Sequence, residues 1–322
     1  MGERIFTNFL IVYVYVFSGF QFANTHREIQ TDRPIVGIVA QSIPRSWKQY
    51  VGAGSSYIVA SYVKFLEASG ARVVPIRTDL NEEKIKKLFQ SINGAIFPGG
   101  RVGLFQSGYA NTSRIIFDLA MKTFDNGGYF PIMGMCLGHQ FLATVVNGPG
   151  EIRIRTDAYN FRAPLNLKKD FRESKLFRNI PDYLVKPFNT TFTAHFHKYS
   201  LPFKLFQENK KLKDFYKVLT TNFDRKGTQF VSTLEARKYP FYSTQWHPEK
   251  CAFEWGIKKK TPHDLTAIKL GQYMSNFFVN EARFSSHKFS SEKEVRGALI
   301  YNYQPVYTGK RQGFAYEQLY AF

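Results

Sequence analysis

Short apolar runs alternate with amphipathic stretches through the first half of the chain. The run 34–40 (PIVGIVA) is typical of a buried strand, whereas 57–69 carries Tyr62 and Leu66 on one face at helical spacing. The same alternation predicts further strands at 71–76, 94–97 and 131–135, and further helices at 82–90, 111–124 and from just after Cys136. Four consecutive strand–helix units imply a parallel sheet that is covered by helices on both faces.

Residues at two helix ends support these boundaries. Gly70 follows the first helical stretch, and glycine is a common C-terminal stop. Asn81 precedes the second helix, where its side-chain oxygen can cap a free backbone N–H. Glu82 and Glu83 lie in the first turn, where carboxylates interact favourably with the helix dipole. We therefore expect the second helix to begin directly after Asn81.

From residue 151 onward the pattern changes to shorter extended runs, with a last helix predicted at 264–283. The clearest extended runs are 218–222, 230–234 and 239–245. No internal repeat is present, and no linker rich in Pro, Gly or Ser divides the chain, so we predict a single domain over residues 25–322. The stretch from residue 285 is polar at first and then rich in Tyr, and we expect it to lie over the domain surface.

The N-terminus has the features of a secretory signal peptide. A basic residue precedes an apolar centre, FLIVYVYVF at 9–17, and the small Ala23 follows shortly after. We therefore predict a signal peptide at 1–24. A membrane anchor is the alternative, but the apolar centre is well short of the about 20 residues that a spanning helix needs, so we expect no stable membrane span. Glycosylation sequons begin at Asn111 and Asn189, and a secretory route would make them usable.

Composition excludes two classes of protein. The 322 residues are 44% hydrophobic and 21% charged, so the chain can bury enough apolar surface to offset its ordering entropy, which excludes wholesale disorder. Only two cysteines are present, which excludes a small scaffold held together by disulfides. We expect a globular protein in which any cysteine chemistry is individual.

The net charge favours an anionic partner. Lys and Arg number 44 against 25 Asp and Glu, which gives +19 at pH 7. Nucleic acid is one candidate, and a small polyanionic substrate is another. The basic residues form no single long block, and their densest pieces are 210–217 and 258–260. We therefore favour a solvated basic surface over a nucleic-acid groove and expect no nucleic-acid partner.

The segment GMCLG at 134–138 ends a predicted strand and opens a helix. A nucleophile on such a turn is presented at the C-terminal edge of the sheet, and flanking glycines allow the close backbone approach that the turn requires. The helix N-terminus stabilises a thiolate at Cys136, and the N–H of Leu137 can bind a developing oxyanion. The alternative is a buried core cysteine followed by a packing glycine.

A second segment, QWHPE at 245–249, places a histidine at the end of a predicted strand and a carboxylate two residues later. A cysteine nucleophile needs a base, and the base needs an acceptor that orients it. Cys136, His247 and Glu249 can fill these three roles. The pair Gly99-Gly100 also lies at a strand end, and Gly100 can supply the second oxyanion donor; the alternative is an ordinary glycine turn.

Together these two segments resemble the class I glutamine amidotransferase-like superfamily, and the wider sequence is similar to the gamma-glutamyl hydrolase family. The similarity runs from about residue 33 to the C-terminus, through ASYVK (60–64), SING (91–94), FPGG (97–100), FHK (196–198), VLTTN (218–222) and FVNEAR (278–283). The resemblance implies an α/β fold of the flavodoxin-like type, a three-layer αβα sandwich. It also implies a lysosomal or secreted enzyme, often a homodimer, that cleaves gamma-linked glutamates from folate polyglutamates through a cysteinyl acyl-enzyme.

The resemblance implies roles for individual residues as well. Cys136 is the expected nucleophile, His247 the base, and His197 a residue near the substrate. Gln140 is expected at the substrate, although family members often have an acidic residue there and the local sequence CLGHQ is closer to the amidotransferase pattern. His195 shares a strand face with His197 if this stretch is extended, and we interpret it as a surface residue outside the site. We expect no metal and no cofactor.

Three functions other than the hydrolase remain open at this point. A glutaminase-type amidotransferase subunit would use the same residues, but the predicted signal peptide and the lack of a synthase domain count against it. An inactive binding protein of the same fold is disfavoured because Cys136, His247 and Glu249 are all present. A basic nucleic-acid binder is disfavoured because no known binding module is found.

Overall fold

The predicted strand–helix alternation builds the parallel half of a mixed central sheet. The computed structural model describes residues 27–52, 54–311, 314 and 316–322. Within this part of the chain the sheet has eight strands in the order β4-β1-β5-β6-β12-β11-β10-β8. In that order they are Arg72–Ile76, Ile35–Val39, Gly94–Phe97, Ile132–Met135, Phe241–Thr244, Gln229–Ala236, Tyr216–Phe223 and Asn166–Leu167. The first five are mutually parallel. Their chain order is 2-1-3-4-5, which is the flavodoxin-like order, so the predicted fold class is confirmed.

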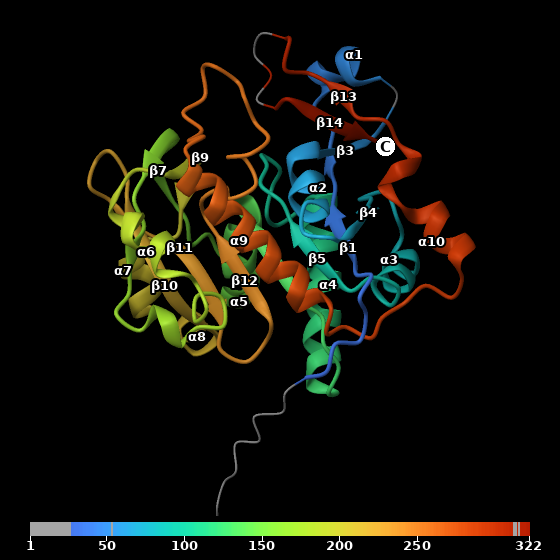
Figure 1. Ribbon diagram of the computed structural model, residues 1–322, viewed down its shortest axis with the longest axis horizontal. Helices are drawn as coiled ribbons and strands as arrows, with labels where there is room; N and C mark the ends of the chain where they lie inside the picture. The colour runs from blue at the N-terminus through green and yellow to red at the C-terminus, as the bar shows by residue number, and fades with distance from the viewer. Residues whose placement is uncertain (1–26, 53, 312–313, 315) are drawn as a thin grey trace, which may run out of the picture.

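Two smaller sheets and a set of helices complete the described fold (Figure 1). One small sheet has the order β13-β14-β3-β2, with strands Val306–Tyr307, Gln318–Ala321, Ser56–Val59 and Gln41–Ser42. The other pairs β7 (Ile154–Ala163) with β9 (Thr193–Ser200). The helices α1 to α10 are Lys48–Val51, Ala60–Glu67, Glu82–Phe89, Gly108–Asp125, Leu137–Asn147, Asp182–Val185, Phe203–Glu208, Lys210–Phe215, Leu265–Ala282 and Glu292–Ala298. Short 3-10 turns lie at Arg45–Trp47, Phe171–Glu173, Lys186–Asn189 and Ile300–Asn302.

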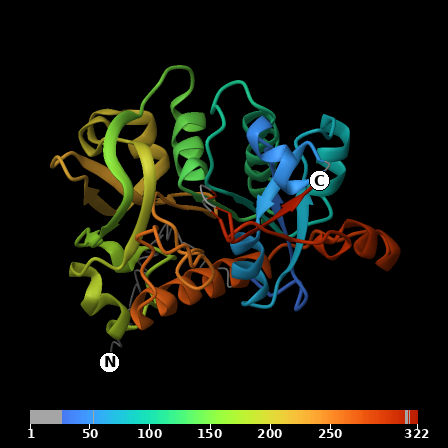
Figure 2. The same cartoon turned by 90° about the horizontal axis from the view of Figure 1, so that it is seen from above.

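Alternating side chains of the central strands form two separate apolar cores. On β1, Val36 and Ile38 belong to one core, whereas Ile35 and Val39 belong to the other. Because successive side chains of a strand point to opposite faces, the two cores lie on opposite sides of the sheet. Helices α2 and α9 contribute to the first core and α3, α4 and α5 to the second. Figure 2 shows these helices on both faces of the sheet, which gives three layers.

Two sequence predictions fail where strands pair over long distances. The predicted helix at 57–69 begins only at Ala60, because Ser56–Val59 form β3. Tyr57 of β3 pairs with Ala321 of β14, and Val59 pairs with Leu319. The end of the C-terminal stretch is therefore part of a sheet, with Leu319 fully buried, instead of lying on the surface as predicted, whereas α10 earlier in the stretch is largely exposed.

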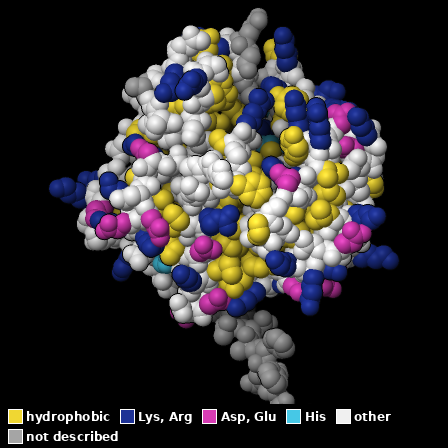
Figure 3. All heavy atoms as spheres, turned by 180° about the vertical axis from the view of Figure 1, so that it is seen from behind, with side chains coloured by type: hydrophobic (Ala, Val, Ile, Leu, Met, Phe, Trp, Pro, Cys, Tyr) yellow, Lys and Arg dark blue, Asp and Glu magenta, His cyan; other side chains and the backbone are white. Residues whose placement is uncertain are grey.

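The predicted signal peptide at 1–24 lies outside the described residues. Among the described helices, none is long and apolar enough to cross a membrane. On the face shown in Figure 3, Lys and Arg side chains are spread among Asp and Glu side chains and do not form one continuous stripe.

Candidate active site

Cys136 lies on the tight turn between β6 and α5, as predicted. Its φ of 52° and ψ of −101° place it in a backbone region that residues with a side chain rarely adopt. The turn is held by its N–H, which donates to the carbonyl of Thr244 (2.7 Å), and by its carbonyl, which accepts from the N–H of Gln140 (3.1 Å). Such strain costs about 1–3 kcal/mol and is typical of functional sites.

The glycines on either side of Cys136 are required by close packing of the backbone. A methyl group added at Gly134 would lie 2.6 Å from the carbonyl oxygen of Gly138. One added at Gly138 would overlap the carbonyl oxygen of Phe97, the last residue of β5. Backbone atoms cannot move away as a flexible side chain can, so only glycine lets α5 start this close to the sheet.

His247 and Glu249 form a buried pair directly after β12. The Nδ1 atom of His247 lies 2.7 Å from Oε1 of Glu249, and both side chains are almost fully buried. Lys250 lies 3.9 Å from the same carboxylate oxygen. The N–H of His247 also donates to the carbonyl of Ala194 on β9 (3.0 Å), which fixes the backbone below the ring. The carboxylate therefore orients the imidazole as predicted.

The charges of this pair follow from their contact. Burial alone would lower the pKa of His247, but the Glu249 carboxylate and the Cys136 side chain outweigh burial and raise that pKa to about 9. Burial opposes ionisation of Glu249, yet His247 and Lys250 hold its pKa below the usual value. At neutral pH the pair is therefore an imidazolium and a carboxylate.

The second ring nitrogen of His247 faces the cysteine. This atom, Nε2, has no hydrogen-bond partner among the described residues. A methyl group added at Gly99 would lie 2.9 Å from Cε1 of His247 and 3.1 Å from Cβ of Cys136, so both side chains border the same glycine. Nε2 is thus free to exchange a proton with the thiol, which is the geometry that a cysteine nucleophile and its base need.

Two side chains anchor the peptide groups on either side of Gly99. The Nε2 atom of Gln41 donates to the carbonyl of Gly99 (2.6 Å), and the N–H of Gly99 donates to the hydroxyl of Tyr62 (2.8 Å). The C=O and N–H of a trans peptide point in opposite directions. Anchoring the Gly99 carbonyl to Gln41 therefore turns the N–H of Gly100 away from Gln41. Neither anchoring residue was predicted from the sequence.

Leu137 supplies the second candidate oxyanion donor. It is the first residue of α5, where an N–H has no acceptor within the helix. Leu137 and Gly100 border the same hollow as Cys136. Two N–H groups on either side of a nucleophile can stabilise the negative oxygen that forms when a carbonyl is attacked.

His197 borders this hollow from β9, in line with its expected place near the substrate. Its Nε2 hydrogen-bonds to Nδ1 of His195 (3.0 Å), and its Nδ1 hydrogen-bonds to Oγ of Ser200 (3.0 Å). The interpretation of His195 as a surface residue is wrong, because packing of β9 against β11 buries it fully. Burial lowers the pKa of His195 to about 3 and that of His197 well below its usual range, so both imidazoles are neutral.

Gln140 lies at the edge of the same hollow, but its amide is occupied by protein groups. Its Nε2 donates to the carbonyl of Tyr199 (2.7 Å) and to Oε1 of Gln245 (3.2 Å). Its Oε1 accepts from Nη1 of Arg153 (2.9 Å). This geometry favours a positioning role, in which Gln140 holds Arg153 at the cleft, over the direct substrate contact that we predicted.

The cleft extends to both sides of Cys136. One hollow, of about 490 Å³, reaches Gln140 and His197, and a smaller one, of about 50 Å³, reaches Tyr62 and Lys250. The residues that border both hollows are Gly100, Arg101, Cys136, Tyr159 and Phe196. No group of three or more His, Cys, Asp or Glu side chains suited to a metal ion occurs in the described part of the chain.

The second cysteine, Cys251, does not lie on a strand-to-helix turn. Cys251 is buried and free, and burial raises the pKa of its thiol to about 12. It lies in a turn after β12, away from any helix that begins at a strand end. His263 lies next to Cys251, but its Nδ1 atom contacts the backbone carbonyl of Cys251 (2.8 Å).

The sequence also matches a known family of peptidases. The model of the family described as Peptidase C26 matches residues 34–249. The chain belongs to this family. Gamma-glutamyl hydrolases from Bos taurus and Homo sapiens are each 45% identical to this chain, and each alignment covers 90% of this chain and 90% of the relative. Gamma-glutamyl hydrolase B from Dictyostelium discoideum is 38% identical over 97% of this chain and 88% of its own length. The resemblance stated from the sequence is thereby confirmed.

Among solved structures, a glutamine amidotransferase from Methylobacillus flagellatus is similar to this C26 peptidase. The two chains share 13% identity with a TM-score of 0.44, over 81% of this chain and 98% of the other. The fold is defined here by the strand order and register described above, and not by this distant likeness.

Proposed function

We propose that this protein hydrolyses the gamma-glutamyl bonds of folate polyglutamates, with Cys136 as nucleophile, His247 as base and Glu249 as the group that orients the base. The observation that carries the proposal is the His247–Glu249 contact of 2.7 Å, with the free ring nitrogen beside Cys136. Family membership supports the reaction class, because the curated relatives are gamma-glutamyl hydrolases.

The acylation half of the reaction follows from these positions. The proton that the Cys136 thiol gives up is held on the His247 imidazolium, and the resulting thiolate attacks the gamma-carbonyl carbon of the substrate. A C–S bond forms, and the carbonyl oxygen becomes an oxyanion between the N–H groups of Gly100 and Leu137. The C–N bond then breaks, and the leaving amine takes the proton from the His247 imidazolium. A thioester on Cys136 and a free glutamate or shorter glutamate chain result.

Deacylation uses the same groups with water as the nucleophile. His247 removes a proton from the water, the resulting hydroxide attacks the thioester carbon, and the oxyanion forms again between the two N–H groups. The C–S bond breaks, and the thiolate of Cys136 leaves beside the His247 imidazolium, which keeps the proton taken from the water and so restores the starting state. Glu249 stays ionised throughout and stabilises the imidazolium at each stage.

The charge of the protein supports a polyanionic substrate. Each gamma-linked glutamate contributes one carboxylate, and the net charge of +19 attracts such a chain over a distance. Free glutamine presents the same scissile carbonyl but lacks the further carboxylates. Binding, and not the nucleophile, must therefore distinguish the two.

We also propose a secretory route, to the lysosome or the outside of the cell. Its support is the apolar stretch at 9–17 with a small residue after it, together with the two sequons. Asn111 and Asn189 are both exposed. The family resemblance adds the expectation of a homodimer.

A comparison of two substrates tests the proposed function. The kcat/KM for folate pentaglutamate should exceed that for free glutamine by at least about 100-fold, and the ratio should shrink as salt screens the charges. Comparable turnover of glutamine would favour a glutaminase and overturn the hydrolase proposal. A preference that persists unchanged at high salt would leave the hydrolase standing and refute the part assigned to net charge.

A further inference from the structure

Three cationic side chains converge on one phenol at the mouth of the cleft. Arg101 Nη2 and Lys259 Nζ each lie 3.4 Å from the hydroxyl oxygen of Tyr159. The Arg101 guanidinium, Lys198 Nζ and Lys259 Nζ lie 6.0, 5.6 and 5.6 Å from the centre of the Tyr159 ring. The three cations come from distant parts of the chain and meet only in the folded protein.

None of these cations forms an ion pair with a carboxylate among the described residues. Neighbouring cations elsewhere are paired: Arg153 contacts Glu151, and Arg225 contacts Asp157. Like charges that gather around a neutral phenol repel one another. Although partial burial opposes ionisation of the phenol, Lys259 and Arg101 lower the pKa of Tyr159, which reflects an excess of positive charge at this point.

The group lies where a substrate chain must pass. Arg101 and Tyr159 border both hollows that flank Cys136. Lys259 borders the smaller hollow, and Lys198 borders the larger one. A ligand that reaches the nucleophile from either side therefore comes within range of at least two of the three cations.

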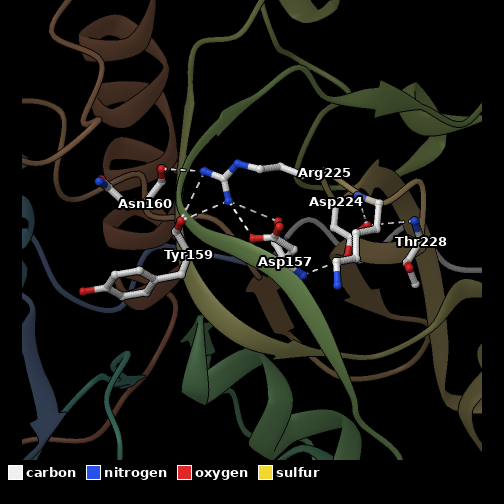
Figure 4. A network of polar contacts seen from close by, with 7 residues as sticks. Asp157, Tyr159, Asn160, Asp224, Arg225 and Thr228 are labelled. Atoms are coloured by element: carbon white, nitrogen blue, oxygen red, sulfur yellow. Dashed lines mark hydrogen bonds and ion pairs between the residues drawn. The ribbon is translucent and has the colours of Figure 1, made fainter.

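A network of polar contacts fixes the position of Tyr159 on β7 (Figure 4). The Arg225 guanidinium donates to the carbonyls of Tyr159 (3.2 and 3.3 Å) and Asn160 (2.8 Å) and to the carboxylate of Asp157 (2.9 Å). The carboxylate of Asp224 accepts from the N–H of Asp157 (2.7 Å). This contact ties β7 to the loop that follows β10. Asn160 has a φ of 53°, and the β7–β9 register shifts at this point.

Asn160, where the register shifts, also holds the loop that carries Lys259. The side chain of Asn160 accepts from the N–H of Lys260 (2.7 Å) and donates to the carbonyl of Lys258 (3.2 Å). Arg162 on the same strand donates to the carbonyl of Lys260 (3.2 Å). Tyr159 and Lys259 are therefore placed by one connected set of hydrogen bonds, so the approach of the cations to the phenol is a built feature of the fold.

We propose that Arg101, Lys198 and Lys259, arranged around Tyr159, form a binding site for an α-carboxylate of a gamma-linked glutamate chain, on a residue adjacent to the one that Cys136 attacks. This assignment rests on the proposed function and names the part of the site that recognises the chain. Arg101 and Lys259 contact the Tyr159 hydroxyl, and a bound carboxylate replaces that hydroxyl as their acceptor. Charge-assisted hydrogen bonds of this kind are stronger than those to a neutral phenol.

Direct binding tests the site without turnover. The parent protein is the full chain with Cys136→Ala, and calorimetry measures the Kd of folate pentaglutamate and of folate monoglutamate. The test variant adds Arg101→Gln and Lys259→Gln. The matched control adds Lys210→Gln and Lys213→Gln, two exposed cations on α8, and so removes the same net charge away from the cleft. Thermal unfolding checks that every variant is folded.

The test variant should bind the pentaglutamate at least about tenfold more weakly than the parent, which is the loss expected for two charge-assisted contacts. The test variant should lose less affinity for the monoglutamate than for the pentaglutamate. The Kd of the control variant for the pentaglutamate should stay within about twofold of that of the parent. Equal losses in the test and control variants would overturn the site, because only the long-range field would then matter. A parent that does not bind the pentaglutamate would overturn it too. Wild-type protein that binds through these cations but does not cleave the chain would overturn the proposed function and leave the site standing.

Discussion

Glu249→Gln isolates the electrostatic part of the proposed mechanism. The substitution keeps the shape of the side chain and removes the charge that lies 2.7 Å from Nδ1 of His247. Without that charge, burial lowers the pKa of the imidazole, and only the Cys136 side chain still opposes burial. His139 shows the effect of burial, since it is fully buried and burial lowers its pKa to about 3.

The expected magnitude follows from the pKa of His247. In the wild-type protein it is raised to about 9, and without the carboxylate it should fall to or below its ordinary value of about 6.5. A fall of about 2.5 pKa units corresponds to about 3 kcal/mol less stabilisation of the imidazolium. Because that cation protonates the leaving amine, kcat should drop by about 10²- to 10³-fold.

The assay is the pH dependence of kcat/KM on folate pentaglutamate. In the wild-type protein the alkaline limb, which reports loss of the His247 proton, should lie near pH 9. In Glu249→Gln this limb should move down by two pH units or more. Glu83→Gln, an exposed residue in the first turn of α3, removes the same charge far from the site and should leave the profile in place. An alkaline limb that stays near pH 9 in Glu249→Gln, with kcat within about tenfold of wild type, would refute the reasoning.

Three further predictions test the packing, the buried histidines and the secretory route. Gly138→Ala should destabilise the protein by about 1–3 kcal/mol in denaturant unfolding, whereas Gly297→Ala, in open space on α10, should be neutral or stabilising. His195 has a folded pKa of about 3, below the unfolded value near 6.5, so the unfolded chain binds the proton first and stability falls as the pH drops below 6.5. Between pH 7 and pH 5 the free energy of unfolding of His195→Gln should therefore fall by about 2 kcal/mol less than that of the wild type. An equal fall in both proteins would contradict this. Protein expressed in cells should lack the apolar N-terminal stretch and carry glycan on Asn111 or Asn189, and an intact, unglycosylated chain would exclude the secretory proposal.

Elements with local signals were predicted closely from the sequence. The strand 94–97 has the predicted bounds, and the helix after Asn81 begins at Glu82, with the Asn81 side chain accepting from the N–H of Lys84 (3.0 Å). The last helix begins directly after Asp264, which caps it in the same way. Capping and apolar periodicity act over a few residues, so a sequence segment carries them by itself.

Features that depend on distant partners could not be predicted. Ser56–Val59 has an apolar pattern that fits a helix, but pairing with β14 near the C-terminus makes it a strand. His195 is buried by the packing of another strand, and nothing in its own neighbourhood indicates that. Cations at 101, 198 and 259 are ordinary surface charges in the sequence, and only the folded chain brings them to Tyr159.

The candidate site falls between these two cases. Cys136 and His247 each carry a local signal, because both follow predicted strands. Their proximity depends on β12 lying next to β6, with Thr244 paired to Met135. That pairing joins segments more than 100 residues apart, so the sequence indicated the proximity only because both residues lie at strand ends, and it did not give the strand order. The orienting residues Gln41 and Tyr62 carried no signal of their own.

Trapping the acyl-enzyme tests the central claim most directly. Wild-type protein mixed with folate diglutamate and quenched in acid within milliseconds should carry a pteroylglutamyl group, and mass spectrometry of the digested protein should locate it on the peptide that contains Cys136. The adduct should be absent from Cys136→Ala and unchanged in Cys251→Ala. An adduct on Cys251, or normal turnover by a folded Cys136→Ala protein, would contradict the account.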